Sequence, residues 1–142
     1  MLTLTWTAKI CITVAGGFFM VGLATGVWKY RHMLTSDDHR APVYVDIAHR
    51  AALMYAFASL LLAVLAAGSK WPEWLDAVGA IVPIFFFAAA VVTYVLLGFA
   101  DETDNQFEQN SWHTTWGTLA LAVGEIGGAS ILFSGFIAGI WL

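Results

Sequence analysis

The sequence predicts an all-α integral membrane protein, with four transmembrane helices in an up-and-down bundle. Of its 142 residues, 60% are hydrophobic and 11% are charged, against roughly 25% charged residues in an ordinary soluble domain. The apolar residues fall into four runs, each longer than the roughly 20 residues that cross the hydrocarbon core of a bilayer. We therefore expect residues 1–142 to form a single domain embedded in the membrane.

The four expected helices have recognisable ends. The first ends in Trp28-Lys29-Tyr30-Arg31, an aromatic and basic anchor typical of the headgroup level. The third follows Trp71-Pro72-Glu73-Trp74, which combines interfacial tryptophans with a proline at a helix start. The fourth has Asn110 or Ser111 as its expected N-cap. The expected helices cover about 6–30, 45–67, 75–100 and 112–142.

The second run shows most clearly that its surroundings are lipid. Its small and polar residues recur at spacings of three and four, so a helix places them on one stripe. The rest of the circumference is bulky and apolar, which suits lipid tails, while small side chains let another helix approach closely. The stripe contains Asp46, His49, Ala52, Ala56, Ser59, Ala63 and Ala66.

The four spans alternate in direction, so the polar connections 31–44 and 101–111 share one side of the membrane. That side carries Lys29, Arg31, Arg40 and Arg50, whereas the other carries Lys9 and Lys70. Basic residues favour the cytoplasm, so we expect cytoplasmic polar connections, external termini and a cell inner membrane location. We expect the acidic connection 101–108 to pair with the basic one, and the net charge of -4 makes nucleic acid an improbable partner.

Two histidines suggest a cofactor. His49 and His113 both lie near the polar connections, and a b-type haem needs one imidazole from each side of the porphyrin plane. Arg40 and Arg50 would then lie near the propionates. A second interpretation is an N/O site for a divalent metal, built from His32, His49, His113, Asp46 and Asp101. The third is that these histidines are ordinary amphipathic residues at headgroup level, with no ligand.

Glu125 is the unusual residue of the fourth run. It follows Trp112 by thirteen positions, so at about 1.5 Å per residue it lies near the bilayer midplane. An ionisable group at that depth is a candidate functional residue that usually faces protein. We expect Ser59 and Tyr55 nearby. Either Glu125 handles protons or contacts a ligand, or it is a protonated carboxyl group that only joins helices by a hydrogen bond.

Glycines form the other strong pattern. They are spaced so that helices can approach closely, either within the bundle or between subunits, and the former use is favoured. The expected packing residues are Gly22, Gly26, Ala52, Ala56, Gly117, Gly124, Gly128, Gly135 and Gly139.

These patterns favour a small, non-catalytic subunit or accessory protein that packs laterally in the lipid bilayer with other membrane subunits, or with itself as a homo-oligomer. The sequence has no GxSxG or phosphate-loop motif, although this does not decide whether the protein is an enzyme. The first alternative is a membrane anchor that binds haem b or a metal, in electron transfer with quinone. The second is a proton-linked carrier that uses Glu125.

Overall fold

The computed structural model describes residues 4–108 and 112–141, and the side chain of His113 lies outside this described part, as do Asn110, Ser111 and Leu142. The described residues form four helices and contain no strand. All four helices are long and apolar enough to cross a membrane, which confirms a four-helix, multi-pass membrane protein. The helices are α1 (Trp6–Thr35), α2 (Val43–Ala67), α3 (Glu73–Ala100) and α4 (Trp112–Trp141).

Three of the helices extend further into the polar residues at their ends than the sequence predicts. The first helix continues five residues beyond position 30, because interfacial charged residues do not end a helix; its stop is Ser36, whose N–H donates to the carbonyl of His32. The second and third helices each begin two residues earlier than expected, directly after Pro42 and Pro72. The first connection is therefore only residues 36–42.

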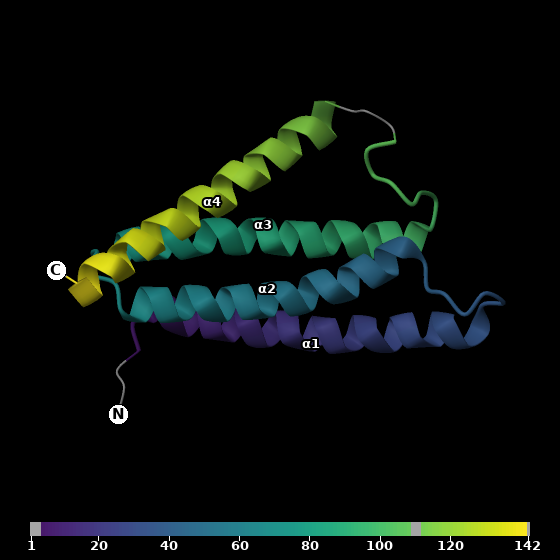
Figure 1. The fold of residues 1–142 in the computed structure, drawn as a ribbon, viewed down its shortest axis with the longest axis horizontal. Coiled ribbons are helices and arrows are strands. Elements are labelled where there is room, and N and C mark those ends of the chain that lie inside the picture. Colours follow the sequence, from purple (N-terminus) through teal and green to yellow (C-terminus); the bar gives the residue numbers. More distant parts are fainter. Residues whose placement is uncertain (1–3, 109–111, 142) are drawn as a thin grey trace.

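The helices run up and down, and the first and last described residues lie at the same end of the bundle (Figure 1). Helix α2 is central and contacts the other three helices, whereas α1 and α4 make no contact within the described residues. Near the polar connections, the Trp28 ring of α1 stacks on Phe99 of α3 at 4.3 Å. The two outer helices therefore lie on opposite sides of α2 and α3.

Helix α2 has its small residues inside and its large ones outside. Ala52 and Ser59 are fully buried, whereas Phe57 is 69% exposed and Leu61 is 58% exposed. This distribution agrees with the expected stripe, because lipid tails solvate bulky apolar side chains. Leu62 is buried as well, because a central helix has protein on more than one side.

Helix α4 joins the bundle through only part of its length. Its C-terminal half crosses α3, and its N-terminal half diverges from α3 towards Trp112 (Figure 1). Only 17% of its most apolar stretch is buried, against 44% for α2. The bundle is therefore closed at the end near the termini and opens towards the connection between α3 and α4.

Candidate functional site

His49 is a contact between α1 and α2. Its Nδ1 lies 2.8 Å from the carbonyl oxygen of Gly22; because a carbonyl can only accept, Nδ1 carries the proton. The ring lies against Gly26, where an added Cβ would approach Cε1 of His49 to 2.9 Å. Gly22 and Gly26 therefore form the surface of α1 on which the imidazole packs.

We expect Gly26→Ala to destabilise the protein by about 1–3 kcal/mol, since the new methyl group overlaps the His49 ring. The cost should largely disappear in a His49→Ala background, where the ring is absent. The measurement is a double-mutant cycle of unfolding free energies in mixed micelles. Additive effects of the two substitutions would contradict this contact.

Asp46 binds two cations one turn before His49. Its Oδ1 lies 2.6 Å from Lys29 Nζ on α1, and its Oδ2 lies 2.8 Å from Arg50. All three side chains are at least 29% exposed, so each pair contributes little stability by itself. Asp46 thus joins α2 to α1 through Lys29, whereas its pair with Arg50 lies within α2.

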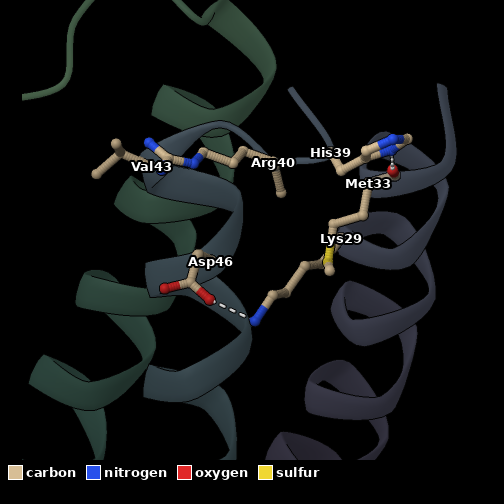
Figure 2. A pocket seen from close by; sticks show the side chains of 7 residues that line it. Lys29, Met33, His39, Arg40, Val43 and Asp46 are labelled. Atoms are coloured by element: carbon tan, nitrogen blue, oxygen red, sulfur yellow. Dashed lines mark hydrogen bonds and ion pairs between the residues drawn. The ribbon is translucent and has the colours of Figure 1, made fainter. Parts of the chain in front are cut away.

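A pocket of about 300 Å³ lies beside the Lys29 and Asp46 pair, where the connection 36–42 folds back over α1 (Figure 2). His39 stands at its edge with Nδ1 3.2 Å from the Met33 carbonyl oxygen, and its φ of 55° lies in the left-handed region. Arg40 extends over Val43, away from His39 (Figure 2). This arrangement brings Arg40 into the same pocket as Asp46.

The structure does not gather the candidate metal ligands into one place. His49 lies between α1 and α2, Asp101 caps α3, and the His32 ring lies 6.0 Å from that of Trp28. Among the described side chains, His, Cys, Asp and Glu form no group of three that could hold a metal ion. Since the side chain of His113 is not described, the pairing of His49 with His113 around haem stays a prediction.

A groove of about 370 Å³ occupies the opening between α3 and α4, hereafter the wedge. Aromatic and small side chains form its walls, with hydroxyl groups among them. Tyr94 also borders a smaller pocket of about 270 Å³ that contains Tyr55 and Arg50 of α2. The wedge is lined by Phe85, Phe86, Ala89, Ala90, Thr93, Tyr94, Gln106, Thr114, Gly117, Thr118 and Leu121.

The mouth of the wedge is polar and acidic. A further groove of about 650 Å³ shares Thr93 and Gln106 with the wedge and adds Glu102 and Glu108 from the connection after α3. The Gln106 N–H donates to the Tyr44 hydroxyl at 2.5 Å, which attaches this connection to the start of α2.

The expected pairing between the two polar connections is not found. The printed sequence carries acids at 101, 102, 104 and 108, yet both ion pairs within residues 4–108 and 112–141 involve Asp46. The acidic connection instead packs on α2 through Tyr44. Of its carboxylates, that of Glu108 accepts a hydrogen bond from the Thr103 hydroxyl at 3.1 Å, and none is in an ion pair within the described residues.

Glu125 lies on α4 one turn beyond the residues that line the wedge. Thr114, Thr118 and Leu121 line it, and Glu125 continues their stripe at helical spacing, one turn nearer to the crossing of α3 and α4. Its Oε1 is buried with no hydrogen-bond partner among the described residues. The carboxyl lies within electrostatic range of the phenols of Tyr55 and Tyr94.

Tyr55 and Ser59 have the expected depth but different surroundings. The Tyr55 ring stacks on Phe87 at 4.3 Å between ring centroids, which holds its phenol between α2 and α3. The Ser59 hydroxyl is buried, and it also has no partner among the described residues. Neither side chain is hydrogen-bonded to Glu125, so a hydrogen bond between Glu125 and Ser59, one of the alternatives for this carboxyl group, is not observed.

Most of the expected packing glycines are inside the bundle, where an added Cβ would meet a neighbouring helix or loop. On α4, Gly124 faces Phe86, and Gly128 faces Pro83 and Gly79. Gly135 and Gly139 meet the connection between α2 and α3. Gly117 is different, because nothing lies within 4 Å of the position of its Cβ.

Sequence reasoning missed the wedge itself. Its α3 wall, with Phe85 and Phe86, looks like any lipid-facing run, and the sequence offers Thr93 and Tyr94 only as candidate intermediates between Glu125 and His49. The available signal was the spacing of Thr114, Thr118, Leu121 and Glu125, which indicates one mixed polar face on the fourth helix. Comparison with protein-family models, curated proteins and solved structures finds no match for this chain, so its function is argued from this geometry.

Proposed function

We propose that this chain is a small, non-catalytic integral membrane subunit that packs laterally with another transmembrane helix in the wedge. The observation that carries the proposal is the divergence of α4 from α3 (Figure 1), which leaves a groove between these two helices. One turn beyond its lining residues on α4 lies Glu125, whose buried Oε1 has no hydrogen-bond partner among the described residues. A bundle that was complete by itself would close this opening.

The polar groups that line the wedge favour a protein helix over lipid as its occupant. Thr93 and Thr118 donate their hydroxyl hydrogens to carbonyls of their own helices, so their oxygens remain as acceptors facing the groove. Acyl chains offer nothing to such acceptors, whereas a helix can bring donors. Gly117 adds a place where another backbone could approach closely, since no atom lies within 4 Å of its Cβ position.

The proposed setting is a cell inner membrane with the wedge opening towards the cytoplasm. Four of the six basic residues lie at the end with the connections 36–42 and 101–111, namely Lys29, Arg31, Arg40 and Arg50. This bias supports cytoplasmic connections and external termini.

A proton-linked carrier is the second candidate. It is favoured by the burial of Glu125 Oε1, since an intramembrane carboxyl group is a common element of proton pathways. The described residues show no continuous chain of hydrogen bonds from Glu125 to either end of the bundle, so lateral packing remains the better supported function.

Photo-crosslinking in native membranes tests the proposed function. A photoreactive residue in place of Thr118, inside the wedge, should yield a discrete adduct with a protein. The same residue in place of Val123, which is 65% exposed on another face of α4, should yield lipid adducts only. Lipid adducts at both positions would overturn the proposal.

A further inference from the structure

We infer that the wedge receives a transmembrane helix of a different protein, and that this helix carries a lysine or arginine that pairs with Glu125. The inference rests on the proposed function, because it specifies the partner that would fill the wedge. Its basis is the juxtaposition of a mid-depth carboxyl, an acidic mouth and the positions of the chain's own basic residues.

Glu125 needs a partner that the described bundle does not provide. Its Oε1 is buried without a hydrogen bond, and intramembrane carboxyl groups normally pair with another charge or a polar group. The nearest aromatic hydroxyls, those of Tyr55 and Tyr94, interact with it electrostatically but are not hydrogen-bonded to it. A lysine or arginine on an incoming helix would supply the opposite charge that this carboxyl group lacks in the described bundle.

The charged residues at and near the wedge are all acidic. The groove at its mouth contains Glu102 and Glu108, no lysine or arginine lines either groove, and Glu125 follows one turn beyond the lining residues of α4. A complementary helix is therefore positive at two levels, once at the headgroup level and once at mid-depth.

The spacing of these two levels predicts a recognisable sequence pattern in the partner. Thr114, at the mouth, and Glu125 are eleven residues apart on α4, which corresponds to about 16 Å along a helix. The partner helix should therefore have a basic cytoplasmic end, and a single basic residue about eleven positions inside the apolar span.

A second copy of this chain does not fit that pattern. Its six basic residues are Lys9, Lys29, Arg31, Arg40, Arg50 and Lys70. Lys9 and Lys70 belong to the end opposite the mouth, Arg31 and Arg40 lie at the headgroup level, and Lys29 and Arg50 are bound to Asp46. None is an unpaired cation at the depth of Glu125, so the cation has to come from another protein.

Designed peptides test the inference with the whole purified chain in phosphatidylcholine vesicles. Two donor-labelled helical peptides of about 23 residues have the same basic ends and the same leucine-rich span. They differ at one position, about eleven residues from one end, which is lysine in the first peptide and leucine in the second. An acceptor dye at Thr118→Cys, with Cys11→Ser to prevent other labelling, reports arrival in the wedge. We expect the lysine peptide to associate roughly 3- to 20-fold more tightly than the leucine peptide.

Variants of the acidic residues identify the contact. Glu125→Gln should remove the preference for lysine. Asp37→Asn also replaces a carboxylate by an amide, but in the exposed connection between α1 and α2, away from the wedge and its mouth, and should leave the preference in place. Helical circular dichroism checks that both variants fold. Equal binding of the two peptides near position 118 would overturn the inference of a basic residue. A preference for lysine that survives Glu125→Gln would overturn it as well. Neither result would contradict lateral packing in the wedge.

Two other results separate failure of the inference from failure of the proposed function. If labelled copies of the chain transfer energy to each other and neither peptide binds, the occupant of the wedge is a second copy. The inference would then be wrong. If neither peptide approaches position 118 and crosslinks there capture lipid only, the proposed function falls together with the inference.

Discussion

Gly128→Ala is expected to lower the unfolding free energy by about 1–3 kcal/mol. The added Cβ would lie 2.5 Å from Cδ and 2.6 Å from Cγ of Pro83, and 2.8 Å from the carbonyl oxygen of Gly79. A proline ring and a backbone carbonyl cannot rotate away as a long side chain can. The substitution therefore forces α3 and α4 apart at their crossing, which also supports the base of the wedge.

Gly127→Ala is the matched control for this effect. Nothing lies within 4 Å of its Cβ position, and alanine favours a helix over glycine by about 1 kcal/mol. The control should therefore be unchanged or slightly more stable. Both variants can be compared by detergent unfolding followed by helical circular dichroism, and similar losses at the two positions would contradict the α3–α4 contact.

Glu73→Ala is expected to lower the unfolding free energy by about 1–3 kcal/mol, because it leaves two buried donors unpaired. The Glu73 Oε1 atom accepts from the Thr7 backbone N–H at 2.7 Å and from the Thr7 hydroxyl at 2.6 Å. Thr7 is only 1% exposed, so water does not replace the lost acceptor. The bond joins the first turn of α1 to the first turn of α3.

The same unfolding assay checks this prediction against two comparisons. Glu102→Ala makes an equal chemical change in an exposed connection and should alter stability by less than about 0.5 kcal/mol. Thr7→Val removes the hydroxyl donor, so its effect should be less than additive with that of Glu73→Ala. Strictly additive losses would show that the two residues do not act through one contact.

Parts of the candidate site were predictable from the sequence, and others were not. The depth of Glu125 follows from counting residues along a helix, so its intramembrane position could be recognised directly. Its position next to the α3 wall with Phe86 could not be recognised, because that wall belongs to another helix whose rotation is set by packing. His49 was predictable as a polar residue near one end, but not as a donor to Gly22.

The helix ends show the same division. Apolar runs measure the length that crosses hydrocarbon, so they placed four spans correctly but missed the last five residues of α1 (Trp6–Thr35). The actual end of α1 depends on the local backbone bond from Ser36 to His32. The hydropathy of a sequence does not report where such a backbone hydrogen bond forms.

The amino-acid sequence by itself determined the lipid environment, the four crossings and the face of α2 that meets protein. These are properties of single helices, for which side-chain size and polarity against hydrocarbon are sufficient. The tertiary structure decided that His49 packs on Gly22 and Gly26, that Gly128 meets Pro83, and that a wedge opens between α3 and α4 one turn from Glu125. Those contacts join residues from different helices, and they depend on crossing positions that only the packing of the whole bundle sets.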